Sequence, residues 1–337
     1  MILFRADANP QIGTGHVMRC LSLADALRDR GRTAVFVLAE PYFQAVIQAR
    51  GYHCTILQTD HSRLEEELPV FLPLLEREQP ALVILDSYFV TAEYLRAVKH
   101  MAPLLYIDDL NAFDYPADIV VNYNIFGPET AYPENKTYLL GPQYAPLRKE
   151  FQGLEKRVVK ERVEHVLVST GGTDPYHTAL RCVGYLRKHP ISSELTYHFV
   201  LGAMNQDIEE IQKATAGIPG IELHCQVTDM RTWMLQCDAA LSAAGTTLYE
   251  LCACGLPTVT YILADNQIPG AAAFQKAGLM PCAGDIRSNP TFEERLMTQL
   301  QLLMSDRERR RRMAQRMQEV VDGNGAGRFA EMICGSF

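Results

Sequence analysis

The sequence lacks long hydrophobic runs and an excess of basic residues. No apolar run approaches the ~20 residues that a membrane-spanning helix needs, and the start MILFRADANP is typical of a first strand rather than a signal peptide. With 32 Lys and Arg against 40 Asp and Glu, the net charge is −8, which argues against a general nucleic-acid binder. We therefore expect a cytoplasmic protein with no nucleic-acid or membrane partner, and no protein partner is implied.

Paired cysteines are also missing. The nine cysteines are scattered and lie mostly in apolar runs, with no CxxC pair and no Cys/His cluster at zinc spacing. Cys252 and Cys254 are one residue apart on an expected helix, so they point to different faces. The pattern indicates free, buried thiols in a reducing compartment and no bound metal.

The first half alternates short aliphatic runs with helical patterns, which predicts a parallel, doubly wound sheet. The 337 residues are enough for two such domains. The expected strands of the first domain are residues 2–5, 33–38, 54–57, 81–86, 104–108 and 119–122. The expected helices are residues 16–30, 42–50, 63–78 and 91–101.

A charged segment, residues 152–164, is expected to connect the domains, which gives a first domain of residues 1–151 and a second of 152–337. The C-terminal helices are assigned to the second domain, with packing back on the first domain as an open alternative. The second domain repeats the alternation, with strands 165–169, 195–201, 221–226, 239–242 and 258–262. Its expected helices start at 175 and cover 206–216, 230–236, 247–254, 268–277 and the tail from 292, which breaks at the glycines of DGNGAGRFAEMI. The sequence thus predicts an α/β protein with two Rossmann-like domains and a cleft between them.

The tail also holds the one dense basic stretch, residues 307–312 (RERRRR). Such runs on a helix are typical of a solvated face, with a phosphate or nucleic-acid site as the less favoured alternative.

The first motif is Gly-Thr-Gly-His at residues 13–16, between the first strand and the first helix. Open α/β sheets bind ligands at this edge, and the glycines permit a close approach to backbone N–H groups. No third glycine completes a dinucleotide fingerprint, which disfavours a nicotinamide cofactor. At the start of a helix His16 feels the positive end of the dipole, which favours a neutral base. A capping or solvated histidine is the competing interpretation.

Two loops of the second domain have the same strand-to-helix position. Residues 169–175 (STGGTDP) offer small residues and N–H groups suited to phosphate oxygens, or form a plain turn with an Asp cap. Residues 242–250 (SAAGTTLYE) suit a diphosphate, with Glu250 placed to accept both hydroxyls of a ribose or merely favoured by the helix dipole. Asn266 follows the next strand and is placed to reach the same ligand. Together these loops favour a nucleotide-sugar enzyme.

Several ordered motifs carry a family resemblance over nearly the whole chain. They are FRADANPQIGTGHVMRCLSLA, LDSY, YIDD, VVNYN, GPQYAPLRKEF, TGGTDP, SAAGTTLYELCACGLPTV and ADNQ. The chain resembles GT-B-fold nucleotide-sugar proteins, and its second domain is similar to the N-acetylglucosaminyltransferase that completes lipid II. More closely, it resembles the UDP-2,4-diacetamido-2,4,6-trideoxy-β-L-altropyranose hydrolases of pseudaminic acid biosynthesis, a pathway linked to flagellin glycosylation.

The resemblance implies a role for each matching position. His16 falls on the general base that activates water for attack at the anomeric carbon, and Tyr88, in LDSY, is the second catalytic candidate. The roles of Asp86, Asp108 and Asp109 stay open. The implied substrate- and UDP-binding residues are Gly13, Gly15, Arg148, Gly171, Gly172, Thr173, Asp174, Thr246, Thr247, Leu248, Glu250 and Asn266.

The implied reaction releases UDP with inversion at the anomeric carbon, with neither a metal nor a cofactor. Helix N-termini take up the charge of the leaving diphosphate. Three alternatives remain: a GT-B glycosyltransferase that uses a UDP-amino sugar, an enzyme that couples hydrolysis to C2 epimerisation, and a non-enzymatic UDP-sugar binding module.

Overall fold

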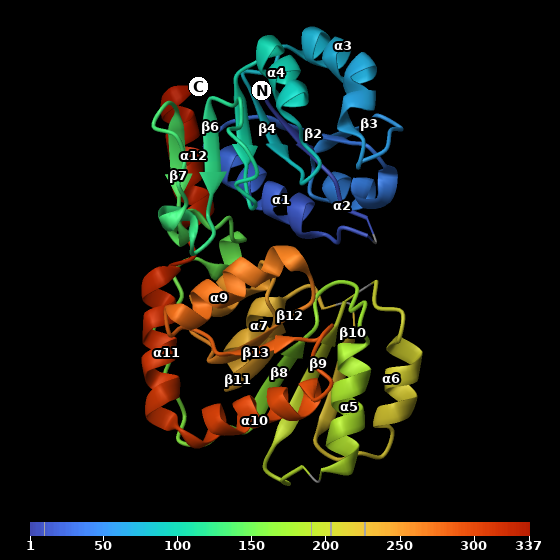
Figure 1. Cartoon of the computed structure of the whole chain (residues 1–337), viewed down its shortest axis with the longest axis vertical. Helices are drawn as coiled ribbons and strands as arrows, with labels where there is room; N and C mark the ends of the chain where they lie inside the picture. Colours follow the sequence, from blue (N-terminus) through green and yellow to red (C-terminus); the bar gives the residue numbers. More distant parts are fainter. Residues whose placement is uncertain (10, 190, 203, 226) are drawn as a thin grey trace. The chain divides into compact units, whose positions relative to one another are not determined.

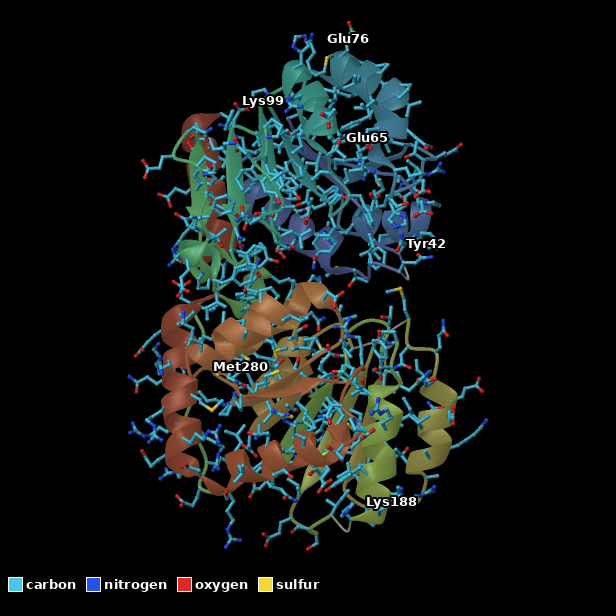
Figure 2. The ribbon with its side chains drawn as sticks, in the orientation of Figure 1. Tyr42, Glu65, Glu76, Lys99, Lys188 and Met280 are labelled. Carbon is cyan, nitrogen blue, oxygen red and sulfur yellow. The ribbon has the colours of Figure 1, made fainter. Side chains whose placement is uncertain are left out.

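The computed structural model describes residues 1–9, 11–189, 191–202, 204–225 and 227–337, and the chain divides into two α/β units (Figure 1). The first unit comprises Met1–Lys149 with Gly323–Phe337, and the second comprises Glu150–Asp322. Charged side chains such as Glu76, Lys99 and Lys188 extend outward from their units (Figure 2). No helix in the described residues is long and apolar enough to cross a membrane.

The first unit is built on a seven-stranded parallel sheet in the order β3-β2-β1-β4-β5-β6-β7. Runs such as ILFRA and LVILD are buried along their whole length, because helices cover both faces of a parallel sheet. The strands are β1 (Ile2–Ala6), β2 (Ala34–Leu38), β3 (His53–Ile56), β4 (Leu82–Asp86), β5 (Leu104–Ile107), β6 (Ile119–Asn122) and β7 (Thr137–Leu140). The strand β7 was not expected from the sequence, because a short edge strand with a partly exposed TYLL pattern has little hydrophobic signal.

The helices of the first unit include one from the far end of the chain. They are α1 (Gly15–Arg28), α2 (Gln44–Ala49), α3 (Leu68–Glu78), α4 (Ala92–Met101) and α12 (Gly325–Ser336). The short 3₁₀ turns are η1 (Pro41–Phe43), η2 (Leu64–Glu67), η3 (Gly127–Glu129) and η4 (Pro142–Tyr144), and a further turn, η5 (Lys149–Phe151), spans the boundary to the second unit. The helix α12 packs on α1, and a Cβ on Gly325 would lie 2.1 Å from the Ala145 carbonyl oxygen. The expected helix break therefore falls before Gly325, where Gly323 has φ +80°, and the later glycines are helical.

The second unit has a six-stranded parallel sheet in the order β10-β9-β8-β11-β12-β13. Its strands are β8 (His165–Ser169), β9 (Thr196–Leu201), β10 (Ile221–Cys225), β11 (Ala239–Ala243), β12 (Thr258–Ile262) and β13 (Cys282–Asp285). Its helices are α5 (Thr178–Lys188), α6 (Ile208–Thr215), α7 (Met230–Gln236), α8 (Thr247–Ala253), α9 (Ile268–Lys276), α10 (Phe292–Ser305) and α11 (Arg307–Val320), with the turn η6 (Asp265–Gln267). Two parallel α/β sheets confirm the predicted fold class.

Some expected boundaries in the second unit are wrong. The helix expected from residue 175 begins at Thr178, because the chain at Asp174 and His177 has positive φ and cannot be helical. Strand β13 was missed because its sequence, CAGD, is short and only partly buried. The strand expected over 221–226 is found as β10 (Ile221–Cys225), and residue 226 lies outside the described residues.

The charged segment 152–164 lies against the second unit instead of forming a helix or strand. The Arg157 guanidinium donates to the carbonyl oxygens of Met234 and Cys254, both at 3.1 Å, and burial lowers its pKa. Arg310 of α11 donates to the carbonyls of Lys160 and Glu161, at 3.1 and 2.9 Å. Arg310 is only 1% exposed, so the expectation of a purely solvated basic run is wrong for this residue. Its hydrogen bonds to carbonyl oxygens compensate for its burial.

Candidate functional site

In each sheet the direction of the connections reverses at one pair of adjacent strands. In the first unit these are β1 and β4, and in the second they are β8 and β11. Ligands of open α/β sheets bind beyond the carboxyl ends of the strands at such a switch point. The predicted catalytic residues follow β1 and β4, and the predicted nucleotide loops follow β8 and β11.

The loop after β1 is shaped by Asn9, which is buried. Its side-chain oxygen accepts hydrogen bonds from the N–H groups of Gln11 and Ile12, both at 3.0 Å, and the Gly13 N–H donates to its carbonyl at 2.8 Å. Gly13 has φ +75°, a conformation that favours glycine. The helix α1 then begins at Gly15, so His16 falls in its first turn.

His16 is paired with Asp86, the last residue of β4. His16 Nδ1 lies 2.6 Å from Asp86 Oδ1, and the two residues are 4% and 1% exposed. Burial alone would raise the pKa of Asp86, but the charge of Arg19 and the hydrogen bonds from Arg19 and His16 outweigh it and hold the pKa below its usual range. Because the ionised carboxylate only accepts, we assign the proton to Nδ1 of the neutral ring, which leaves Nε2 as the base.

Arg19, one turn further along α1, holds Asp86 in place. Its Nε and Nη2 atoms donate to the two carboxylate oxygens of Asp86, each at 2.5 Å, and Nη2 also lies 2.8 Å from Asp109 Oδ2. Its Nη1 donates to the Tyr123 hydroxyl at 2.5 Å. Burial alone would lower the pKa of Arg19, but Asp109 and Asp86 raise it well above its usual value. Arg19 was not among the residues predicted from the sequence, although its position three residues after His16 places it on the same side of the helix.

Tyr88, the other catalytic candidate, lies against His16. The two rings meet edge to face, with centroids 4.4 Å apart and an interplanar angle of 78°. Asp108 and Asp109, whose roles were left open, make different contacts. Asp109 pairs with Arg19, whereas Asp108 accepts from the N–H groups of Leu110 and Asn111, at 2.8 and 3.0 Å, and so holds a turn.

The loop after β8 is closely packed by the neighbouring strand. A Cβ on Gly202, which follows β9, would lie 2.4 and 2.5 Å from the carbonyl oxygens of Gly172 and Gly171. Gly171 itself has φ +85° and is exposed. Thr173 is half-buried.

Asp174 in the same loop is 2% exposed and caps α5. Its carboxylate oxygens accept from the N–H groups of Thr178 and Ala179, at 2.8 and 2.9 Å. The geometry therefore assigns this side chain to the helix start, which is the plain-cap alternative considered above.

The loop after β11 presents mostly small residues. Thr246 is exposed, while Thr247 and Glu250 are half-buried. Leu248 is 1% exposed, so it can reach a ligand only through its backbone. Asn266 is exposed in η6, which follows the adjacent strand β12. These residues thus share one edge of the second sheet.

Arg148 lies near the end of the first unit and is half-buried. Its contact with a ligand, like the cleft between the domains, stays a prediction.

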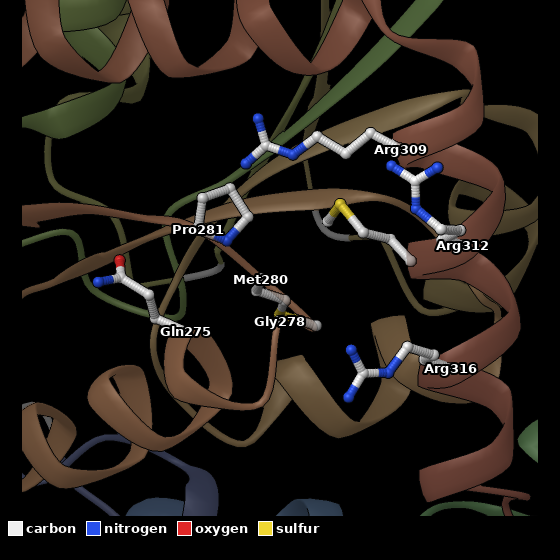
Figure 3. Close-up of a pocket in the computed structure, with 8 residues that line it drawn as sticks. Gln275, Gly278, Met280, Pro281, Arg309, Arg312 and Arg316 are labelled. Atoms are coloured by element: carbon white, nitrogen blue, oxygen red, sulfur yellow. The ribbon is translucent and has the colours of Figure 1, made fainter.

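A separate pocket of about 340 Å³ lies beside α11. Arg309, Arg312 and Arg316 extend toward it from α11, and Met280 and Pro281 line its other side (Figure 3). These two residues precede β13, so the pocket lies at the amino end of a parallel strand. The predicted nucleotide loops follow the opposite, carboxyl ends of the strands, and this basic pocket is therefore not part of that site.

Comparison with known proteins defines the class of fold first. The crystal structure of Acinetobacter baumannii MurG matches with a TM-score of 0.71 and 14% identity, covering 99% of each chain. Two Rossmann-like units in this arrangement of strands are the fold of GT-B glycosyltransferases.

Two proteins with more specific names are similar to this chain in sequence. The spore coat polysaccharide biosynthesis protein SpsG of Bacillus subtilis is 25% identical over 97% of this chain and 96% of its own length. The UDP-2,4-diacetamido-2,4,6-trideoxy-β-L-altropyranose hydrolase of Campylobacter jejuni is 26% identical over 63% of this chain and 73% of its own length. No family model matches the chain.

Proposed function

We propose that this chain is a nucleotide-sugar enzyme that hydrolyses UDP-2,4-diacetamido-2,4,6-trideoxy-β-L-altropyranose or a closely related UDP-amino sugar. The observation that carries the proposal is the buried His16–Asp86 pair at the switch point of the first sheet. The similarity to the Campylobacter jejuni hydrolase supports this choice of substrate.

In the proposed reaction, Asp86 holds the Nδ1–H of His16, and Nε2 takes a proton from water. The water oxygen attacks C1 of the sugar while the bond between C1 and the UDP oxygen breaks, and its electron pair leaves with UDP. Attack from the face opposite the leaving group inverts the anomeric configuration. Diphosphate is a stable leaving group, so the general acid of a glycosidase is not required. Tyr88 packs against the His16 ring and limits its rotation.

The second unit would hold UDP in this proposal. Backbone N–H groups of residues 171–173 and 246–248 would face the diphosphate, as helix N-termini and glycine loops do in other phosphate sites. Glu250 would accept the ribose hydroxyls, and Asn266 and Arg148 would complete the contacts. Asp174 would act by fixing the first loop. None of these steps needs a metal ion.

A second candidate is a glycosyltransferase that passes the same type of sugar to an acceptor. The observation in its favour is the similarity, over 97% of this chain, to the spore coat polysaccharide biosynthesis protein SpsG, because assembly of a polysaccharide requires sugar transfer. A transferase would use the same base, His16, to deprotonate an acceptor hydroxyl in place of water.

One experiment separates the candidates. The protein is incubated with a panel of UDP-sugars in buffer alone and with candidate sugar acceptors, and NMR identifies the released sugar and its first-formed anomer. We expect UDP and a free, inverted sugar in buffer alone, with the same rate after EDTA treatment. UDP release only with an acceptor would identify a transferase, and release of a C2 epimer would identify an epimerase. UDP binding without turnover of any sugar would indicate a binding module.

A further inference from the structure

Three histidines and a glutamate gather on one face of the second sheet, among the described residues and away from the proposed UDP loops. Glu222 of β10 is the register partner of His198 on β9, and His224 follows two residues later on the same face of β10. His165, at the start of β8, lies on this face beside His198. The group lies along the strands, whereas the loops 171–174 and 246–250 follow the carboxyl ends of β8 and β11.

The three side-chain atoms that converge there have the spacing of metal ligands. His198 Nδ1 lies 3.1 Å from His224 Nε2 and 3.3 Å from Glu222 Oε2, and the last two atoms are 3.7 Å apart. Ligand atoms of a tetrahedral zinc ion, with bonds of about 2.0–2.1 Å, are about 3.3 Å from one another. A point about 2 Å from all three atoms therefore exists without movement of the backbone.

The surroundings also fit a bound ion. The remaining ring nitrogen of His198, Nε2, lies 2.9 Å from His165 Nδ1, and metal-bound histidines commonly donate this second N–H to a neighbour. The Trp233 ring of α7 lies against His224, with centroids 3.7 Å apart, and restricts its rotation. The Glu222 side chain is 57% exposed, so a fourth position is open to water.

We propose that His198, Glu222 and His224 bind one zinc ion, with water as the fourth ligand. Two imidazoles and one carboxylate around an open position form a ligand set that zinc accepts. The ion would join the edge strand β10 to β9. It lies outside the proposed reaction, so it would stabilise the second unit without taking part in turnover. A chain of hydrogen bonds among the same side chains, without an ion, is the alternative.

The test uses the full chain after removal of metals with EDTA and dialysis. Cobalt(II) is added as the spectroscopic probe, followed by zinc as competitor. We expect one cobalt per chain, with the visible absorption of a four-coordinate ion that zinc abolishes, and a thermal midpoint that rises with added zinc. Cobalt binding well below one equivalent, or an absorption typical of a six-coordinate aquo ion, would overturn the proposal.

Matched variants locate the ion. Glu222→Gln and His224→Gln change partly exposed side chains, and each should weaken cobalt binding roughly tenfold or more, since even the loss of an outer neighbour of a ligand costs about 10–100-fold. His100→Gln changes an exposed histidine of α4, and Cys225→Ser changes the exposed thiol that follows His224 on β10; both should leave the affinity unchanged. Equal affinity in the wild type and both ligand variants would contradict the site.

Discussion

The two units share a topology but differ in what they place at the switch point. In the first, buried ionised side chains meet beyond β1 and β4, where Asp86 contacts both His16 and Arg19. In the second, glycines, threonines and backbone groups follow β8 and β11. A side chain that moves a proton must be held in one orientation, whereas a loop that surrounds a diphosphate needs free N–H groups and little bulk. The proposed function accordingly places chemistry in the first unit and binding in the second.

The first unit contains a second network of buried charged side chains, centred on Arg5. Arg5 is 1% exposed and donates to Glu67 at 2.8 and 2.6 Å and to Asp7 at 2.5 Å, while the Tyr94 hydroxyl donates to Glu67 at 2.5 Å. Burial alone would lower the pKa of Arg5, but Asp7 and Glu67 raise it. Asp7 also accepts the N–H of Ala39, at 2.8 Å. Ion pairs thus fix the strand ends around the candidate catalytic loop.

The largest expected effect is that of His16→Asn. Asparagine keeps a donor toward Asp86 but has no basic nitrogen, so kcat for UDP-sugar hydrolysis should fall about 10²–10⁴-fold. The affinity for UDP, measured by calorimetry, should remain close to that of the wild type, because the second unit is assigned the nucleotide.

The control is His53→Asn, which changes an exposed histidine of the same unit and should leave kcat unchanged. If His16→Asn turns over at a near-native rate, the base is misassigned. If instead its UDP affinity collapses while kcat is kept, the division between the two units is wrong.

The next effect is that of Asp86→Asn, which breaks the first unit's charge network. The carboxamide offers Arg19 one acceptor in place of two charged oxygens and leaves the guanidinium buried without its closest counter-charge. Removal of one partner of a buried ion pair costs about 3–5 kcal/mol in the free energy of unfolding. Urea denaturation at neutral pH measures this loss, and kcat should fall as His16 loses its orientation.

The pH dependence of the stability lost in Asp86→Asn identifies the cause of the loss. The pKa of Asp86 is lower in the folded chain than in the unfolded chain, so its ionisation stabilises the fold above the unfolded value of about 4. As the pH falls below that value, the contribution is progressively lost, and the stabilities of the wild type and Asp86→Asn should converge. A difference that stays constant on acidification would indicate a packing defect rather than the loss of an ionised carboxylate.

Hydrophobic patterning was sufficient to predict most of the fold, because strands buried on both faces are apolar along their whole length. The exceptions, β7 and β13, are edge strands of four residues with partial burial. Neither periodicity nor turn residues mark such strands.

In the candidate site, too, local sequence patterns predicted some residues and missed others. Local motifs drew attention to His16, Tyr88 and the glycine loops, whose roles stay predictions. They could not show that Asp86 lies 2.6 Å from His16, because the two residues are 70 positions apart and meet only when β1 pairs with β4. The group at His198 and Glu222 was not predicted for the same reason. Adjacent strands bring these two residues together, although the spacing of the two residues in the chain resembles no zinc motif. Alternation along β10, which puts Glu222 and His224 on one face, was the one local signal.

A moderate effect is expected in the second unit from Gly202→Ala. The new Cβ would overlap the carbonyl oxygens of Gly171 and Gly172, so the loop must shift, at a cost of about 1–3 kcal/mol in stability. The dissociation constant for UDP should rise, while kcat at saturating substrate changes little. Gly184→Ala is the matched control, because its Cβ meets no atom within 4 Å inside α5 and should stabilise the chain by about 1 kcal/mol. A fall in kcat without weaker UDP binding would contradict a binding role for this loop.

The smallest expected effect, that of Asp174→Asn, tests whether a carboxylate in the second unit acts on the ligand or on the fold. Asparagine has one acceptor oxygen, so one of the two N–H groups at the start of α5 loses its partner, at a cost of about 1 kcal/mol. Thermal denaturation should show this loss, whereas the UDP dissociation constant should stay near the wild-type value. A large loss of UDP affinity with unchanged stability would mean that Asp174 contacts the ligand directly. The second unit would then use a buried charge in its site, as the first unit does.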